Sequence, residues 1–423
     1  MPALSSKWIF DGSGSEAFAG TVSIDGVRIS EVRSSLPDVT SGPSDAVDLD
    51  GFAILPGLID AHTHLGLVAQ PLGSPSPLAV VAAQIFANAR TALDEGFTTV
   101  RDVGGIDGGL VEAINRGLAV GPRILPSGPM ISQRGGHGDW RSPFDHGAWE
   151  MGTPGLVQPT ALADGPEEMT RVARMALRDG ATQLKVALSG GFSSDCDALD
   201  DVQFNVQELR AAVSVAHSRH TYVTAHAHHA AAIRLGLDAG IECFEHGTFV
   251  DNQTVQDLHR QKGMLVATLS VVSRYQDPEL RAQLRPDLAG KARDAFPAMS
   301  RTVQMAVAAG ITVGSGSDQV GPDQRRRGRE LAVRARVTNP LEAVYAATGA
   351  NARVLRVESE AGSLRPGMAA DVIVVAGNPV EEPELFEDPT RVRLVVRRGQ
   401  ICKNTLPKSL AAEVANRFAS QSS

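Results

Sequence analysis

Short apolar segments alternate with longer segments of helical periodicity through the middle of the chain. The apolar segments are typical of buried β-strands, and eight of them are predicted to end near His62, Val103, Ser127, Val186, His226, His246, Leu269 and Asp318. The alanine-rich amphipathic segments predict helices over residues 78–95, 107–117, 167–179, 206–219, 229–239, 252–262, 298–309 and 339–348. The last of these begins with Asn339 as N-cap and Pro340 in its first turn.

Strands that alternate with helices favour a parallel sheet with helical crossovers. Eight such units predict an α/β fold, a (β/α)8 TIM-like barrel, over residues 57–362. A doubly wound sheet is the alternative, but no glycine-rich phosphate-binding sequence follows the first strand, which disfavours it. The connections at 128–165 and 270–297 are longer than a barrel needs. Loops of that length are usually functional lids or disordered.

The two ends of the chain share a different pattern of short strands and tight turns. Asp25-Gly26 lies between two short alternating runs, which is a strong hairpin signal. Residues 371–375 and 392–396 are predicted strands of the same kind. We therefore expect both termini to form one small β-sandwich domain, with the barrel inserted between its two parts. The predicted boundaries are 1–56, 57–362 and 363–423.

Composition narrows the class of protein. The chain has 423 residues and 43% apolar content, so it can bury a large core. Its 40 basic and 48 acidic residues give a net charge of −8, and aromatic residues make up 4%. This balance argues against nucleic-acid and anionic-membrane partners. The three cysteines, Cys196, Cys243 and Cys402, are widely spaced, which argues against a disulfide framework or a thiolate zinc site.

No membrane segment is predicted. The uncharged stretch 65–89 is long enough to cross a bilayer, but it contains three prolines, two glycines and two glutamines. It is better interpreted as a loop that enters a helix. The first residues have no basic region followed by an apolar run, so no signal peptide is predicted and a cytoplasmic location is expected.

Metal-ligating residues stand at the ends of several predicted strands. His62 and His64 close the first strand, and residues two apart in an extended chain point to the same side. His226, His246 and Asp318 end three later strands. Barrel enzymes place their chemistry at the carboxyl ends of the strands. Four imidazoles and one carboxylate at that edge predict a site for zinc or a similar divalent ion.

Lys185 lies inside the apolar fourth strand, Gln183 to Leu188. A buried ammonium is costly unless it is neutralised or paired. One interpretation is an ion pair or a snorkelling side chain. The other is a carbamate, formed when the neutral amine adds carbon dioxide, which is an anion able to bridge two metals.

These motifs together resemble the metal-dependent amidohydrolase superfamily, from about residue 8 to residue 405. Further matching sequences are Leu55-Pro56-Gly57 before the first strand, Glu245-His246-Gly247, Gly316-Ser317-Asp318, Ala346-Ala347-Thr348 and the run from Gly362 to Asp371. Lys185 and the sequence Gly135-Gly136-His137-Gly138 are similar to the imidazolonepropionase-related branch, which includes prolidase-like carboxypeptidases and ochratoxin-hydrolysing amidases.

The resemblance implies a binuclear zinc centre. His62, His64 and Asp318 would hold the buried metal, His226 and His246 the exposed one, and carbamylated Lys185 would bridge both. Asp318 would also act as general base and then acid. The implied reaction is hydrolysis of an amide that links an acyl group to an amino acid with a free carboxylate, including ochratoxin A, which yields ochratoxin alpha and phenylalanine. The resemblance also implies a homo-oligomer.

Two other functions are weighed against this one. A cyclic amidase or deaminase acting on an imidazolone-type ring uses the same fold. The long third loop favours a larger, linear substrate instead. A non-catalytic scaffold is expected to lose metal ligands, and here all six positions are filled.

Substrate contacts are predicted on the third loop and the fifth strand. His137, between glycines, is predicted to contact the substrate and to be the second catalytic candidate, while His228 is predicted to meet a substrate carboxylate and His229 to face away. The arginine run 325–327 is interpreted as a solvated surface, with anion recognition as the alternative. Aromatic side chains of the third loop either line the pocket or fix the loop, namely Trp140, Phe144 and Trp149.

Overall fold

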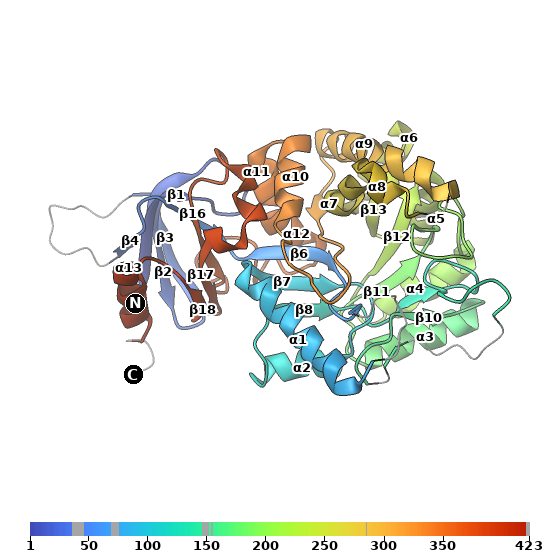
Figure 1. The fold of residues 1–423 in the computed structure, drawn as a ribbon, viewed down its shortest axis with the longest axis horizontal. Helices are drawn as coiled ribbons and strands as arrows, with labels where there is room; N and C mark the ends of the chain where they lie inside the picture. The colour runs from blue at the N-terminus through green and yellow to red at the C-terminus, as the bar shows by residue number, and fades with distance from the viewer. Residues whose placement is uncertain (36–45, 69–75, 146–151, 154, 285, 420–423) are drawn as a thin grey trace.

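The computed structural model describes the chain except for residues 36–45, 69–75, 146–151, 154, 285 and 420–423. Strands from both ends of the chain lie together in one sheet, and the middle of the chain forms parallel strands covered by helices (Figure 1). The predicted α/β fold with a parallel sheet is therefore confirmed. No helix among the described residues is both long and apolar enough to cross a membrane.

The parallel strands form two groups. The first is a three-stranded sheet in the order β6-β7-β8, and the second is a seven-stranded sheet in the order β10-β9-β11-β12-β13-β14-β15. Their bounds are β6 (Leu58–Thr63), β7 (Phe97–Asp102), β8 (Arg123–Pro126), β9 (Met130–Ser132), β10 (Thr160–Leu162), β11 (Leu184–Ala187), β12 (Val223–His229), β13 (Cys243–Phe249), β14 (Met264–Ala267) and β15 (Val313–Ser315). All eight predicted strands are present, and β9 and β10 are short strands that the pattern did not predict.

Backbone hydrogen bonds connect the two groups of strands. The Thr182 N–H donates to the carbonyl of Pro126 at 2.8 Å, which joins the segment before β11 to the end of β8. The Asp318 N–H donates to the carbonyl of His62 at 2.9 Å, which joins the segment after β15 to β6. The carboxyl ends of strands from both groups therefore meet at one edge of the parallel layer.

Helices cover the outside of these strands, as the periodicity predicted. They include α1 (Leu78–Asp94), α2 (Gly108–Asn115), α3 (Pro166–Arg178), α4 (Val206–His217), α5 (Ala230–Ala239) and α6 (Asn252–Gln261). The helix predicted over 339–348 is α-helical only as α11 (Pro340–Tyr345), and the chain continues as a π-helical turn and then as α12 (Asn351–Val354). The helix α10 (Arg329–Val337) was not predicted.

The segment 270–297 is mostly helical, so the interpretation of a long irregular loop is wrong. It holds α7 (Leu269–Ser273), α8 (Pro278–Arg281) and the first half of α9 (Pro286–Ala308). The helix predicted over 298–309 therefore begins about three turns earlier. Its buried residues recur at helical spacing and pack into the same core as the parallel strands, and they are Ala295, Met299, Val303 and Ala306. Two of the charged residues that suggested a loop, Arg293 and Asp294, are exposed on this helix.

The ends of the chain form a mixed sheet in the order β18-β17-β16-β5-β1-β2-β3, with β4 paired to β1. Its strands are β1 (Ala3–Ile9), β2 (Phe18–Asp25), β3 (Arg28–Arg33), β4 (Val47–Asp48), β5 (Phe52–Pro56), β16 (Val372–Ala376), β17 (Val392–Arg397) and β18 (Gln400–Asn404). The predicted sandwich of two sheets is corrected here, because hydrogen bonds join all eight strands into one sheet. The hairpin at Asp25-Gly26 is confirmed between β2 and β3.

Both faces of this terminal sheet are covered, because its central strands alternate between two cores. Ile54, Val372 and Val374 face one core, which also contains Val414 and Phe418 of α13 (Lys408–Ala419). The intervening residues face the core that contains the buried side of α1, and they include Ala53, Leu55, Ile373 and Val375. The terminal sheet is thus packed directly against the parallel-strand layer.

Candidate metal centre

The six predicted metal ligands line one small cavity at the carboxyl edge of the parallel strands. The cavity has a volume of about 190 Å³. His62 and His64 come from the end of β6, Lys185 from β11, His226 from β12, His246 from β13 and Asp318 from the segment after β15. Strand direction alone places these side chains at one edge, so the sequence expectation that they converge agrees with the geometry.

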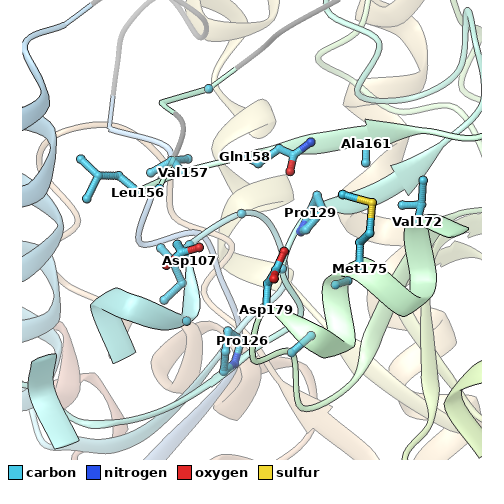
Figure 2. Close-up of a pocket in the computed structure, with 18 of the residues that line it drawn as sticks. Asp107, Pro126, Pro129, Leu156, Val157, Gln158, Ala161, Val172, Met175 and Asp179 are labelled. Atoms are coloured by element: carbon cyan, nitrogen blue, oxygen red, sulfur yellow. The ribbon is translucent and has the colours of Figure 1, made fainter. Parts of the chain in front are cut away.

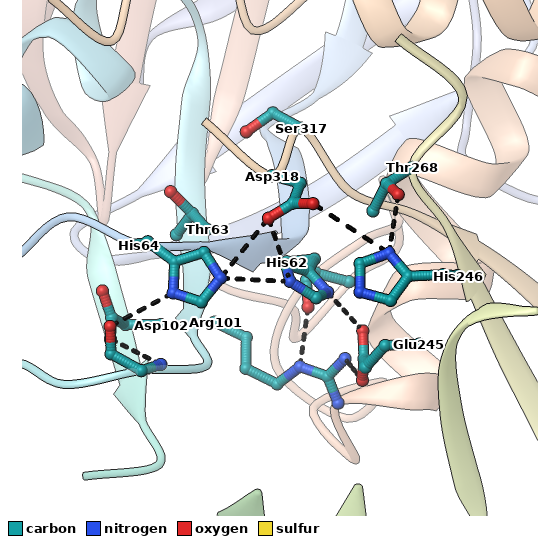
Figure 3. Close-up of polar contacts among 12 residues, drawn as sticks. His62, Thr63, His64, Arg101, Asp102, Glu245, His246, Thr268, Ser317 and Asp318 are labelled. Atoms are coloured by element: carbon teal, nitrogen blue, oxygen red, sulfur yellow. Dashed lines mark hydrogen bonds and ion pairs between the residues drawn. The ribbon is translucent and has the colours of Figure 1, made fainter. Parts of the chain in front are cut away.

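An inner cluster consists of His62, His64 and Asp318 (Figure 3). The two Nε2 atoms lie 3.3 Å apart, and Oδ1 of Asp318 lies 3.3 Å from Nε2 of His62 and 3.4 Å from Nε2 of His64. The Nδ1 atoms are already engaged, since His62 bonds Glu245 at 2.7 Å and His64 donates to the carbonyl of Gly104 at 3.2 Å. Both rings therefore point Nε2 at the aspartate.

Local backbone geometry brings this cluster together. A Cβ atom at Gly316 would lie 2.3 Å from Cβ of His62, so only glycine lets the chain after β15 approach β6 so closely. His246 and Asp318 have φ angles of 69° and 50°, in the left-handed region that non-glycine residues rarely adopt. Such strained residues are typical of functional sites.

An outer cluster consists of His226, His228 and His246, each of which has a nitrogen within 4.8 Å of the others. Nε2 of His226 donates to the carbonyl of Gly190 at 3.2 Å, which leaves its Nδ1 free. Nδ1 of His246 bonds the hydroxyl of Thr268 at 2.9 Å, which leaves its Nε2 free. One nitrogen of each of these two rings is thus fixed by a hydrogen bond, as in metal-ligating histidines held by outer hydrogen bonds.

His228 was predicted only as a substrate contact, and the structure places it inside the outer cluster. Its ring is stacked on that of His246, with centroids 4.9 Å apart and an interplanar angle of 17°. Its Nδ1 bonds the hydroxyl of Thr248 at 2.8 Å, just as Nδ1 of His246 bonds Thr268. The neighbouring residue, His229, stacks on Phe249 outside the cavity, as the alternation of the strand predicted.

Charge favours ligation at the outer cluster. Burial lowers the pKa values of His226, His228 and His246 well below 6.5, and repulsion from neighbouring imidazoles lowers them further. Neutral imidazole is the form that binds metals. In the inner cluster burial alone would raise the pKa of Asp318, but its attraction to His62 and bonds from both histidines bring that pKa well below 3.8. The aspartate is therefore ionised at neutral pH.

Lys185 is buried and lines the same cavity as the two clusters, and its Nζ has no hydrogen-bond partner among the described residues. The side chain does not reach solvent, and it forms no ion pair of 4.0 Å or less with the described residues. Burial, reinforced by repulsion from Arg101 and opposed by Glu245 and Asp318, lowers its pKa to about 8. An amine with no partner, surrounded by ligating groups and close to its neutral form, fits the metal-bridging interpretation.

The sequence analysis assigned no role to a buried network beneath the clusters. Oε1 of Glu245 accepts a hydrogen bond from Nη2 of Arg101 at 2.5 Å, and Nη1 of Arg101 lies 3.2 Å from the hydroxyl of Tyr222. Both Glu245 and Arg101 are fully buried. The signal in the sequence was a charged residue inside a buried strand, Arg101 in β7 and Glu245 in β13.

The interpretation of the arginine run as a solvated surface is wrong for Arg327. Its side chain is fully buried, and Nη1 forms an ion pair with Asp60 at 2.9 Å and also donates to Thr63. Arg325, in contrast, is exposed. A run of like charges does not reveal that one member faces inward, because the chain turns between Arg325 and α10.

The residues of the third loop that were predicted to contact the substrate do not all line the cavity. His137 lines the cavity, with its ring stacked on His226 at a centroid distance of 4.1 Å. Trp140 also lines the cavity. Phe144 is 92% exposed, so it does not line the pocket. Trp149 lies outside the described residues.

A second cavity has a volume of about 520 Å³ (Figure 2). It is larger, but it contains none of the six predicted ligands. Asp107, Gln158, Met175 and Asp179 lie around it, between α2 and α3. Chemistry rather than size therefore identifies the smaller cavity as the candidate site.

Parallel strands that bring two clusters of histidine and aspartate to their carboxyl edge are typical of metal-dependent hydrolases. The chain belongs to the amidohydrolase family, whose model matches residues 53–402. It is accordingly a hydrolase, and the resemblance recognised in the sequence is confirmed.

The chain is also similar to individual proteins over most of its length. Ochratoxinase from Aspergillus niger is 33% identical over 376 residues, which cover 83% of this chain and 75% of that protein. The crystal structure of A. niger ochratoxinase superposes with a TM-score of 0.82 at 28% identity, and 95% of each chain is covered. A prolidase crystallised with N-methylphosphonate-L-proline superposes with a TM-score of 0.85 at 31% identity, covering 95% of this chain and 99% of that one.

Proposed function

We propose that this protein is a binuclear zinc amidohydrolase that cleaves the amide bond of N-acyl amino acids or dipeptide-like substrates with a free carboxylate, ochratoxin A among them. The observation that carries the proposal is the orientation of the rings. One nitrogen of each of the four ligand histidines is held by a hydrogen bond, namely in His62, His64, His226 and His246. The second nitrogen points at Asp318 in His62 and His64. The similarity to ochratoxinase and to a prolidase supports the choice of substrate class.

We propose that the two groups of parallel strands close into a (β/α)8 barrel over residues 57–362, with 1–56 and 363–423 forming the second domain. The hydrogen bonds from Thr182 to Pro126 and from Asp318 to His62 support closure. We also propose that the protein assembles as a homo-oligomer, on the family resemblance, and sedimentation analysis tests that point.

The residues fit two divalent ions. His62, His64 and Asp318 would hold the inner ion, and His226 and His246 the outer one, with carbamylated Lys185 between them. The unpartnered Nζ of Lys185 is the observation that supports the bridge. When bound, two zinc ions supply the Lewis acidity that activates water near neutral pH and polarises the amide carbonyl.

The chain's own residues then complete the reaction. The ionised carboxylate of Asp318 accepts a proton from the attacking water and returns it to the leaving nitrogen, which could not leave as an anion. His137 lies beside the outer cluster, where it contacts the substrate, and His228 presents its free Nε2 to the substrate carboxylate. Phe192 and Tyr275, whose rings lie 5.6 Å apart, provide apolar surface for the amino acid side chain.

The test is a hydrolysis screen with zinc and bicarbonate supplied. N-acyl phenylalanines, dipeptides and ochratoxin A form one arm, and imidazolone-type cyclic amides form the other. We expect release of the free amino acid from the first arm only. Turnover confined to the cyclic amides would replace the proposal by the cyclic amidase alternative.

A further inference from the structure

His137 is held on several sides by the segment that follows β11. Its backbone N–H donates to Oε1 of Gln203 at 3.0 Å, and the next amide, of Gly138, donates to Oγ of Ser194 at 3.0 Å. A Cβ atom at Gly191 would lie only 2.2 Å from the His137 ring, so glycine is needed where that ring is seated. The segment after β11 therefore fixes the position of the His137 imidazole.

Two side chains of the same segment face Nδ1 of the ring. Oγ of Ser194 lies 3.0 Å from Nδ1, and Oδ2 of Asp197 lies 3.6 Å from it. Asp197 is itself buried and accepts the Gly191 N–H at 3.0 Å, so its carboxylate is fixed. A carboxylate only accepts hydrogen bonds, and the Ser194 hydroxyl, which accepts one from Gly138, has a second lone pair with which it can accept another. The buried carboxylate of Asp197 therefore favours the hydrogen on Nδ1 of His137.

The other nitrogen of the ring is left for a ligand. Within the described part of the chain no group bonds Nε2 of His137, although the residue lines the cavity. With the hydrogen on Nδ1, Nε2 carries a lone pair and accepts a hydrogen bond. The ring stacks on His226 at 4.1 Å, so this acceptor lies beside the outer cluster, where the scissile amide must bind.

We propose that Asp197 and Ser194 are positioning residues that fix the Nδ1–H form of His137, so that Nε2 accepts a hydrogen bond from the N–H of the scissile amide. The inference rests on the proposed function and adds a substrate preference. Secondary amides, which carry that hydrogen, are favoured over tertiary amides, which lack it.

The first measurement is independent of turnover. In zinc-loaded protein with ¹⁵N-labelled histidine, the signals of His137 are assigned by their loss in His137→Phe. We expect the Nδ1–H form in the wild type and a mixture of forms in Asp197→Asn and Ser194→Ala. Asp195→Asn, in the same segment, is the matched control and should leave the signals unchanged. An Nε2–H form in the wild type, or no change in Asp197→Asn, would overturn the positioning role.

The second measurement compares N-acyl-L-phenylalanine with its N-methyl analogue. We expect kcat/KM of the wild type to be about tenfold or more higher for the secondary amide, which is the scale of one hydrogen bond to a preorganised group. Asp197→Asn should remove most of this preference, and Ser194→Thr should retain it. In the His137→Phe background, Asp197→Asn should change kcat/KM less than twofold.

The outcomes separate the two proposals. Equal loss on both substrates, or full additivity with His137→Phe, would show that Asp197 has only a structural role. Hydrolysis of no N-acyl amino acid, with the histidine signals as expected, would reject the proposed function and keep the positioning role. Metal content is measured in every variant, so that loss of the outer ion is not mistaken for loss of the hydrogen bond.

Discussion

Nδ1 of His62 donates a hydrogen bond to Oε2 of Glu245 at 2.7 Å, although the two residues are 183 positions apart in the sequence. This contact fixes the ring so that Nε2 points at Asp318. The other oxygen of Glu245 binds Arg101. One carboxylate thus links β6, β7 and β13 beneath the inner cluster and sets the direction of a metal-facing nitrogen (Figure 3).

We predict that Glu245→Gln weakens metal binding at the inner cluster by about 10–100-fold, the range seen when an outer partner of a ligating histidine is removed. It should also lower stability, because Arg101 loses its buried partner. Competition with a chelator and thermal unfolding measure the two effects. Glu242→Gln, on the surface before the same strand, is the control. Unchanged metal affinity in Glu245→Gln would contradict the positioning of His62.

Two divalent ions per chain are expected in protein purified without chelator. The reason is that the ligand-type residues form two groups, with Lys185 buried in the same cavity; the groups are His226, His228 and His246, and His62, His246 and Asp318. Elemental analysis gives the number. Prolonged dialysis against a chelator should abolish hydrolysis, and added zinc should restore it. Full activity in metal-free protein would reject the metal centre.

Lys185→Ala should lose both metal and activity, because in the proposed site the buried amine, as a carbamate, bridges the two clusters. Short carboxylates added in solution should restore a small part of the activity. Lys185→Arg should not substitute, since a guanidinium stays cationic and cannot ligate. Metal content and turnover are measured on the same preparations. Wild-type turnover in Lys185→Arg would show that the lysine is structural.

Asp318→Asn separates catalysis from metal binding. The amide preserves the shape and part of the ligation but cannot accept a proton. Metal content should therefore fall little, while turnover falls by about 100-fold or more, the scale for loss of a positioned base. Substrate KM should change little. Near-normal turnover with both metals retained would remove Asp318 from proton transfer and make His137 the first candidate.

Glu330, which is not one of the proposed metal ligands, gives a pH-dependent contribution to stability. Its carboxylate accepts the backbone N–H groups of Leu269 and Ser270, and burial raises its pKa from 4.5 to about 7. Between these values the folded state holds a proton that the unfolded chain has lost, so stability falls as pH rises through this window. Glu330→Gln has no carboxyl group at this position and therefore lacks this pH-dependent contribution to stability.

The unfolding midpoint of Glu330→Gln relative to the wild type should therefore rise between pH 5 and pH 7.5. Calorimetry at several pH values gives the difference curve. Glu342→Gln, whose partner Arg334 is on the same helix as Glu330, is the control. A flat difference curve for Glu330→Gln would show that its carboxylate is not protonated in the folded protein.

Much of the fold follows from the sequence alone. The apolar segments and helical periods locate the eight strands and most of the helices, because burial on one face or both leaves a period in the chain. The hydrophobic period does not predict the length of a helix reliably where charged residues are frequent. Residues 270–297 looked irregular because the exposed face of α9 is strongly charged, while only every third or fourth residue is buried.

The set of candidate ligands was also predictable, since each belongs to the end of a strand and parallel strands end at one edge. Their orientation was not. Which nitrogen of His62 faces Asp318 depends on Glu245, and which nitrogen of His226 is free depends on the carbonyl of Gly190. These partners are distant in sequence, and no local pattern records them.

The sequence by itself determined the ligand types, their placement at strand ends and the membership of the family, because these depend on residue identity and on periods within one segment. Only the tertiary structure decided that His228 lies with His226 and His246, that Arg327 is buried against Asp60, and that Asp197 faces His137. Each of these is a contact between different segments. Its energy depends on the three-dimensional packing that brings the partners within reach, which a linear pattern does not encode.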